Sequence, residues 1–251
     1  MKRYHTVLLV LLGAIAVSVL TVVANVARSR SQVSGIEVSI RYGQTPALVD
    51  RQMVVDSVLS ALPALLSMKV SEVNNRAVAE AASHVPYLRD VSASVSVSGK
   101  VIVRATQRRP IARLFYQSSE LYFDADGFLM PASPIGDCDV LVATGAFAEP
   151  LRTDSLNAQL VSLVALANWL DSHRRYKGLI DQIHIDRGGN VLMVPKLGDH
   201  LIELGPVDRL DSKFANLWSF YLNGMPRAGW NTYSKISLKF DGQVVCTKEA
   251  K

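Results

Sequence analysis

The sequence predicts an α+β protein: an N-terminal transmembrane helix, a domain with the element order β-α-α-β-β, and a mostly β C-terminal domain with two helices. Twenty residues without an ionisable side chain, Val7 to Val26, stand near the N-terminus. Short runs in which apolar and polar residues alternate, as in half-buried strands, recur from Ile36 onward. Four stretches with helical spacing lie between these runs, so we expect parts at 1–30, 36–106 and 107–251.

The segment from Val7 to Val26 is long enough to cross a bilayer as one helix. At about 1.5 Å per residue it would extend roughly 30 Å, the thickness of the hydrocarbon core. Thirteen of its twenty residues are Val, Leu or Ile. The alternative is a cleaved signal peptide with Lys2 and Arg3 in front. Because the apolar core of a signal peptide is about 7 to 15 residues long, we favour a retained single-pass anchor.

Most of the net positive charge of the chain lies around this segment. Residues 1–30 hold four of the 27 basic residues and none of the 22 acidic ones, so the remainder has a net charge of +1. Basic residues flank the anchor on both sides and do not decide its orientation. Because the remainder looks like a secreted domain, we expect a cytoplasmic N-terminus and an external C-terminal body. No basic stripe studded with aromatic residues is present, so we expect no nucleic-acid partner.

The first domain is expected to contain three strands and two helices. A strand runs from Ile36 to Arg41, Asp50 begins a helix that Pro63 ends, and a second helix begins near Ser71. A hairpin follows with its turn at Ser98-Gly99. Its alternating apolar positions are Val91, Ala93, Val95 and Val97, then Val101, Val103 and Ala105. Alternating strands bury one face, so the two helices are expected to cover it.

The second domain is expected to be mostly β. Helices are predicted at Ser155 to Leu170 and Asp208 to Leu222. Turn residues such as Asp124 to Gly127 and Asp241-Gly242 separate short strands. The predicted strands are Glu120 to Phe123, Phe128 to Met130, Val140 to Thr144, Ile180 to Asp186, Val191 to Val194, Leu201 to Leu204, Ser234 to Phe240 and Gln243 to Thr247.

Two cysteines agree with an oxidising compartment without defining a disulfide scaffold. Cys138 stands between Asp137 and Asp139, whose charges would raise the thiol pKa. Cys246 lies in an apolar run, where a buried inert thiol is the usual case. Both two free thiols and a Cys138–Cys246 disulfide are compatible with the sequence.

Several motifs resemble those of one bacterial family. Gln107-Arg108-Arg109-Pro110-Ile111-Ala112 follows the hairpin and resembles the Glu-Arg-x-Pro-Val-Ala segment that ends the POTRA region of the cell-division protein FtsQ, called DivIB in other bacteria; Gln107 replaces the usual Glu. Tyr122 to Gly127 is similar to a hairpin of that family. The C-terminal matches are Ile202 to Gly205, Lys213-Phe214, Phe220-Tyr221, Gly229-Trp230, Tyr233 and Ile236 to Cys246.

The resemblance implies a POTRA domain at 36–106 and a β domain whose last strands accept a partner segment by strand addition. It implies partners of the FtsB and FtsL type and the machinery of septal wall synthesis. Trp230 is expected in the core rather than at the interface. The candidate partner-binding residues are Ser234, Ile236, Leu238, Phe240, Gln243, Val244, Val245, Cys246 and Thr247. Strand periodicity turns only about half of them toward any one side.

The sequence lacks a pattern that would carry catalysis. The Gly188-Gly189-Asn190 stretch is too short for a phosphate loop and is typical of a hairpin turn. Five histidines are scattered, with no pair at i, i+4. His184 and Asp186 share a strand face, for which a solvated surface is the better interpretation than a metal site. We therefore expect no enzyme activity, no cofactor, no metal and no small-molecule substrate.

These observations predict a non-enzymatic scaffold of the bacterial division machinery. It would lie in the inner membrane at the division septum, link division proteins and help to regulate septal peptidoglycan synthesis. The first domain would either recruit the protein or act as a rigid spacer. The alternative function is a secretion or outer-membrane assembly factor acting by β-augmentation. Such factors usually carry repeated POTRA units and a long barrel, and this chain lacks the series of alternating strands that a barrel needs.

Overall fold

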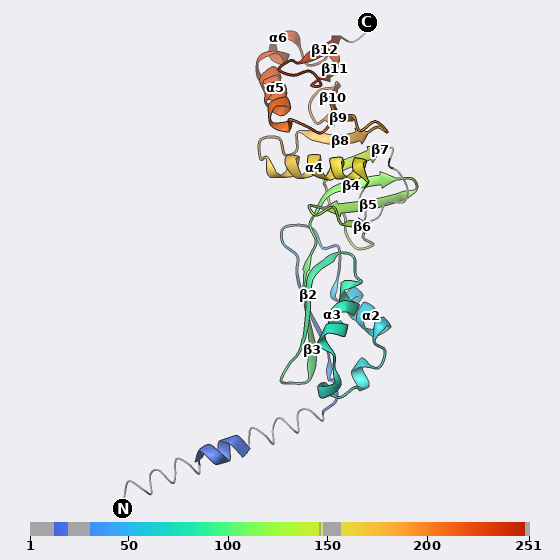
Figure 1. The fold of residues 1–251 in the computed structure, drawn as a ribbon, viewed down its shortest axis with the longest axis vertical. Helices are drawn as coiled ribbons and strands as arrows, with labels where there is room; N and C mark the ends of the chain where they lie inside the picture. Colours follow the sequence, from blue (N-terminus) through green and yellow to red (C-terminus); the bar gives the residue numbers. More distant parts are fainter. Residues whose placement is uncertain (1–12, 20–30, 146, 148–156, 249–251) are drawn as a thin grey trace, which may run out of the picture. The chain divides into compact units, whose positions relative to one another are not determined.

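A computed structural model describes residues 13–19, 31–145, 147 and 157–248 (Figure 1). They form two compact units, the first ending at Gln107 and the second beginning at Arg108. Residues 13–19 are helical, and the rest of the predicted anchor, Val7 to Val26, lies outside the described residues. Within the described ranges, no helix has the length and apolar character needed to cross a membrane.

The first unit is a three-stranded sheet with two α-helices on one face. Its elements are β1 (Gly35–Arg41), α2 (Arg51–Ala61), α3 (Asn75–Ser83), β2 (Leu88–Val95) and β3 (Lys100–Gln107), with short 3-10 turns at Leu65–Ser67 and Val70–Glu72. The strand order is β1-β3-β2, in which β3 runs parallel to β1 and antiparallel to β2. The predicted order β-α-α-β-β is therefore the observed one.

Side-chain caps place the starts of both helices in this unit. Asp50 accepts a hydrogen bond from the Met53 amide at 2.8 Å, so it caps α2 as predicted. The second helix begins later than expected, because residues near Ser71 form a 3-10 turn. Asn74 caps α3 by accepting from the amides of Arg76 and Ala77. An asparagine that satisfies two first-turn amides fixes the helix start more strongly than apolar spacing.

The second unit is a nine-stranded mixed sheet covered by two helices on one face. Its strands, β4 to β12, lie in the order β12-β11-β10-β9-β8-β7-β4-β5-β6. The strands are β4 (Pro110–Tyr116), β5 (Ser119–Asp124), β6 (Leu129–Pro131), β7 (Leu141–Gly145), β8 (Ile180–Ile185), β9 (Val191–Pro195), β10 (Leu201–Gly205), β11 (Tyr233–Ser237) and β12 (Val245–Lys248). The helices are α4 (Ala158–Ser172), α5 (Leu210–Asn223) and the short α6 (Met225–Ala228).

Two elements of the second unit were not predicted. One is the short helix α6. It has Pro226 in its first turn, where proline is favourable. Strand β4 was also missed, because buried residues follow one another from Pro110 to Ala112 instead of alternating. This strand lies between β5 and β7 in the sheet interior, where both edges are paired. Because successive residues at its start are buried, β4 is covered on both faces there and shows no clean period of two.

The hydrophobic core of the second unit lies between the sheet and helices α4 and α5. Each helix connects two neighbouring parallel strands, α4 between β7 and β8 and α5 between β10 and β11. Because the two connections run in the same direction along the sheet, connections of the same hand place both helices on one face. The fully buried helix residues are Leu160, Leu163, Leu166, Phe214 and Leu217.

Candidate functional site

Strand β12 is the outer strand at one end of the nine-stranded sheet. It pairs antiparallel with β11, through Ile236 opposite Cys246 and Ser237 opposite Val245. No other described strand pairs with β12, so one of its two rows of backbone amide and carbonyl groups is unpaired within the described sheet. An unpaired row of this kind is a template for strand addition.

The hydrophobic core of the sheet extends to this edge. Adjacent residues of seven neighbouring strands form one continuous row on the helix-covered face: Leu114, Ala143, Ile183, Met193, Ile202, Ile236 and Cys246. All except Cys246 are fully buried, whereas Cys246 is half-buried. The row therefore ends at a partly covered position, where an added strand would continue the core by one more residue.

The structure divides the predicted partner-binding residues by exposure. Ile236 and Leu238 are 0% and 1% exposed, so their side chains close the core and are unavailable to a partner. Phe240 and Val245 are 54% and 43% exposed. Gln243 and Thr247 are also exposed, while Ser234, Val244 and Cys246 are half-buried.

The two final strands are shorter than predicted. β11 ends at Ser237 instead of Phe240, and β12 begins at Val245 instead of Gln243. The amide of Leu238 donates to the carbonyl of Glu203 in β10 at 2.8 Å. Residues 238–244 thus form a connection at the end of the hairpin, which we call the β11–β12 connection. Five of its residues are exposed: Lys239, Phe240, Asp241, Gly242 and Gln243.

An open groove of about 370 Å³ lies between α5 and the β11–β12 connection. Its lining residues are Asn216, Ser219, Phe220, Asn223, Gly224, Gly242 and Val244. The Phe220 ring packs against Tyr233 of β11 with ring centroids 5.9 Å apart. We call this feature the edge groove. Sequence reasoning selected Val244 but missed the helix residues, because their spacing in the chain says nothing about which strand they face.

Trp230 packs against Tyr221 of α5, with ring centroids 5.3 Å apart, and is half-buried against the core. Tyr221 in turn contacts His200, whose Nε2 lies 2.6 Å from the tyrosine hydroxyl. His200 is 1% exposed, and burial lowers its pKa. Burial raises the pKa of Tyr221 in the same way. Both groups are therefore neutral near pH 7, and they support the core behind the edge groove.

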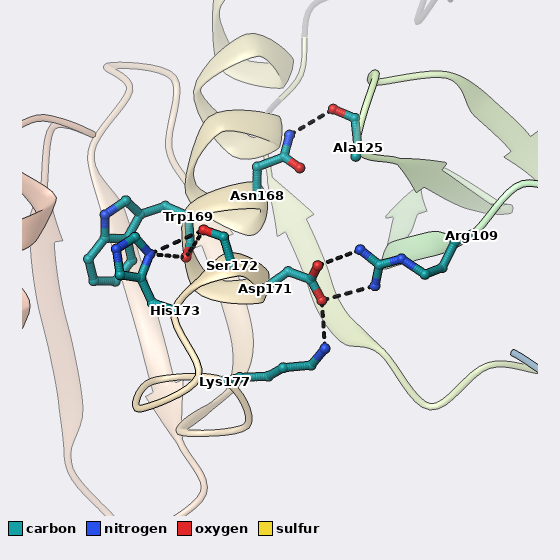
Figure 2. Close-up of polar contacts among 8 residues, drawn as sticks. All are labelled: Arg109, Ala125, Asn168, Trp169, Asp171, Ser172, His173 and Lys177. Atoms are coloured by element: carbon teal, nitrogen blue, oxygen red, sulfur yellow. Dashed lines mark hydrogen bonds and ion pairs between the residues drawn. The ribbon is translucent and has the colours of Figure 1, made fainter. Parts of the chain in front are cut away.

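The predicted arginine pair contributes structural contacts at the start of the second unit. Arg108 donates to Asp124 at 2.7 Å and lies over the Phe128 ring. Arg109 donates through both terminal nitrogens to the carboxylate of Asp171, near the end of α4, and Lys177 lies 2.9 Å from the same carboxylate (Figure 2). The Arg109 contact joins the start of β4 to the C-terminal end of α4, a pairing that the sequence did not reveal.

The hydrogen bond from Arg109, together with Lys177, lowers the pKa of Asp171 to about 2. A carboxylate at the C-terminal end of a helix is unfavourable with respect to the helix dipole. The two cations offset this cost by charge-assisted hydrogen bonds. Asn168, one turn earlier in α4, donates to the carbonyl of Ala125 at 2.7 Å, so α4 is joined to the β5–β6 turn as well (Figure 2).

Both cysteines are free, so the structure contains no Cys138–Cys246 disulfide. Burial raises the pKa of both thiols, and for Cys138 the nearby Arg113 partly opposes this rise. Burial, rather than the neighbouring aspartates that the sequence suggested, is therefore the main cause at Cys138. Neither thiol is activated as a nucleophile.

The histidine and acidic residues singled out from the sequence have structural partners. His184 Nδ1 lies 2.9 Å from the Thr144 hydroxyl, and the Asp186 carboxylate accepts from the backbone and side-chain amides of Asn190. Asp186 therefore closes the Gly188-Gly189-Asn190 turn. Across the described part of the chain, no three His, Cys, Asp or Glu residues are grouped so that they could hold a metal ion.

The fold and this edge define a class of protein: a one-sided mixed β-sheet that presents an unpaired strand beside a groove. Comparison with protein families identifies the class further. A family model described as "FtsQ/DivIB, C-terminal related" matches residues 109–247, more than half of the 251 residues, and the chain belongs to this family. The family resemblance stated from the sequence is thereby confirmed. A search of curated proteins finds no match.

Family membership indicates a role in cell division through protein partners. The FtsQ/DivIB family is a family of non-catalytic division proteins, which agrees with the expectation that this chain is not an enzyme. The match covers almost all of the second unit, including β12 up to Thr247.

Proposed function

We propose that this protein is a scaffold of the bacterial division machinery that binds a partner by adding the partner's strand to β12. The partner is of the FtsB type, acting with an FtsL-type protein, as the family resemblance implied. The single observation that carries the proposal is the unpaired edge of β12 at the end of a nine-stranded sheet. It fits a scaffold because backbone hydrogen bonds provide affinity while alternate side chains provide specificity.

The edge groove supports strand addition at β12 rather than at the opposite end of the sheet. A partner strand would place every second side chain on the helix-covered face, next to Cys246 and the groove wall formed by Phe220 and Val244. Half-buried apolar residues at this edge are Phe220, Tyr233, Val244 and Cys246. Completing their burial would favour association.

The proposal places the protein in the inner membrane, with a cytoplasmic N-terminus and a periplasmic C-terminal body, at the division septum. The apolar segment from Val7 to Val26 supports a single-pass anchor. The first unit, with the order of a POTRA domain, would either recruit the protein or set its distance from the membrane. Through its partners, the scaffold would help to regulate septal peptidoglycan synthesis.

A charge on the exposed face of β12 tests the proposal. Val245→Glu puts a carboxylate on a side chain that is 43% exposed, at the position where a partner strand would pair. We expect loss of binding to the FtsB-type partner, because the carboxylate replaces an apolar side chain beside the added strand and is partly desolvated there, while the unit stays folded. Binding is measured with the purified full-length chain and the partner's periplasmic segment, and folding by circular dichroism.

Val194→Glu is the matched control. Val194 is 37% exposed on the same sheet face, but it belongs to β9 in the sheet interior. The Val194→Glu variant should bind the partner as tightly as the unmodified chain. Equal binding by Val245→Glu and the unmodified chain would refute strand addition at β12, and so would equal loss of binding in both variants.

A further inference from the structure

The β11–β12 connection forms one wall of the edge groove through Gly242 and Val244. Its first residues are held by β10, because the Leu238 amide donates to the Glu203 carbonyl and Lys239 Nζ lies 3.6 Å from Glu203 Oε1. Pairing between β11 and β12 stops at Ser237 opposite Val245. Within the connection, the Gln243 amide donates to the Phe240 carbonyl at 3.3 Å and closes a turn. The shape of the groove therefore depends on what holds this turn toward α5.

Arg209, the residue before α5, reaches the turn. Its Nη1 lies 2.6 Å from Asp241 Oδ1. Asp241 is largely exposed, with 82% of its side chain accessible. Among the described residues, this is the one ion pair made by residues 240–244. The pair thus links the start of the helix that forms one wall of the groove to the turn that forms the other.

The backbone around Arg209 is held in place independently of this ion pair. Arg209 has a left-handed conformation, with φ 46° and ψ 39°, which is uncommon for a residue with a side chain. The buried Lys213 ammonium donates to the Pro206 carbonyl at 2.8 Å and to Asp208 Oδ1 at 2.5 Å. The Arg209 carbonyl accepts from the Lys213 amide at 3.1 Å. The backbone that carries the Arg209 guanidinium is therefore held in place.

We infer that Arg209 is a positioning residue for partner binding, which holds the β11–β12 connection at the distance from α5 that a docked strand requires. The inference rests on the proposed function. An exposed ion pair contributes little to global stability. The effect of the ion pair on binding is larger than its effect on global stability, because a turn already held in its bound position loses less conformational freedom on association. Arg209 acts through Asp241 and not by touching the partner.

A charge swap tests this role. Arg209→Asp places a carboxylate against Asp241 and beside Asp208, whose Oδ2 lies 3.8 Å from Arg209 Nε. Asp241→Arg places a second guanidinium group against Arg209. Each should weaken binding of the FtsB-type partner's periplasmic segment by about fivefold or more. The double variant Arg209→Asp/Asp241→Arg restores the attraction and should bind within about twofold of the unmodified chain. Aspartate tolerates the left-handed conformation at position 209, and Arg209→Gln provides a neutral second variant.

A second readout needs no partner. Hydrogen exchange of the amides in residues 238–244 should be faster in Arg209→Asp and should return to the original rate in the double variant. Lys196→Asp is the control, because Lys196, just after β9, and Asp181, at the start of β8, form a half-exposed pair 3.8 Å apart. It should change neither the binding nor the exchange of the connection.

The outcomes separate the inference from the proposed function. If the unmodified chain does not bind the partner segment, strand addition by that partner is wrong. The hydrogen-exchange measurement still tests whether the Arg209–Asp241 pair holds the β11–β12 connection. If the unmodified chain binds and Arg209→Asp binds equally well, Arg209 does not position the groove. If both single variants weaken binding and the double variant fails to restore it, Arg209 or Asp241 contacts the partner directly and the inference is overturned.

Discussion

The side-chain amide of Gln107 makes hydrogen bonds that a carboxylate could not make. Its Oε1 accepts from the Leu48 amide at 2.7 Å, and its Nε2 donates to the Thr45 hydroxyl and to the Pro46 carbonyl. The side chain is 4% exposed. A glutamate, which the resembling motif of the family has at this place, could not donate both bonds in its charged form. In this chain the glutamine joins the end of β3 to the segment before α2.

Gln107→Glu should therefore destabilise the first unit by about 1–3 kcal/mol at pH 7, because two acceptors lose their donor and a carboxylate faces a carbonyl oxygen. Burial would raise the pKa of the new glutamate above its unfolded value of about 4.3. The protonated form is tolerated better, so the loss should be smallest below about pH 4 and should grow as the pH rises. Urea unfolding at pH 7 and pH 4 measures it.

Gln182→Glu, at an exposed position of β8, is the control and should shift stability by less than about 0.5 kcal/mol. A loss for Gln107→Glu that does not depend on pH would contradict the role of the amide group.

His200 gives the second unit a pH-dependent stability. Its pKa is lowered by burial, and its Nδ1 has no hydrogen-bond partner among the residues that the structure describes. The unfolded chain therefore binds a proton more readily than the folded one. The stability that depends on neutral His200 is complete above about pH 6.5 and is lost as the pH falls through the lower pKa of the folded state, by at most about 1.4 kcal/mol per pH unit.

His200→Gln removes the titrating group, so we expect a flatter dependence of the unfolding midpoint on pH between 7 and 5. Tyr221→Phe keeps the histidine and should keep the slope, although it removes the 2.6 Å contact between their side chains. The measurement is urea unfolding followed by tryptophan fluorescence. An unchanged slope in His200→Gln would assign the acid sensitivity to another group.

At the scale of elements, the contact between β4 and α4 depends on Asp171. Its carboxylate has a pKa lowered to about 2, first by Arg109 and then by Lys177. The stabilisation is therefore complete above about pH 3.8, the ordinary value, and is lost as the pH falls toward 2. Because about half of the Arg109 side chain is exposed, solvent screening reduces the contribution of the pair.

Asp171→Asn should lower the free energy of unfolding of the second unit by about 1 kcal/mol at pH 7. The difference from the unmodified chain should shrink between pH 3.8 and pH 2, where the native carboxylate itself becomes protonated. Urea unfolding at pH 7 and pH 3 provides the comparison. A difference of the same size at both pH values would show that shape, rather than charge, determines the contact.

At the scale of the whole molecule, the proposed partner binding belongs to one of the two compact units. The unpaired strand and the edge groove belong to the second unit, which is also the part that the family model matches. We expect depletion of the protein in its host to produce long, undivided cells, and a fluorescent fusion to concentrate at the division site. Normal division with uniform envelope fluorescence would contradict the division role, whereas Val245→Glu should give the depleted phenotype if β12 is the binding edge.

The sequence by itself determined the elements whose signals are local. Alternation located most strands, Asp50 marked a helix start that its side chain does cap, and the C-terminal motifs indicated the family to which the chain belongs. Each signal lies within a few residues of the element it specifies, so it can be recognised without knowing the fold. Alternation also restricted the partner-facing residues of the last hairpin to about half of them.

Only the tertiary structure decided which surfaces these elements present. β4 lacks a clear period because both of its faces are covered at Pro110 to Ala112, and Ile236 and Leu238 are buried because α5 covers their face of the sheet. The Arg209–Asp241 pair joins residues that are 32 positions apart in the chain, and the edge groove likewise joins α5 to the β11–β12 connection. Which strand lies at the edge, and which helix lies beside it, follows from strand order and crossover direction, and no local pattern in the sequence encodes either.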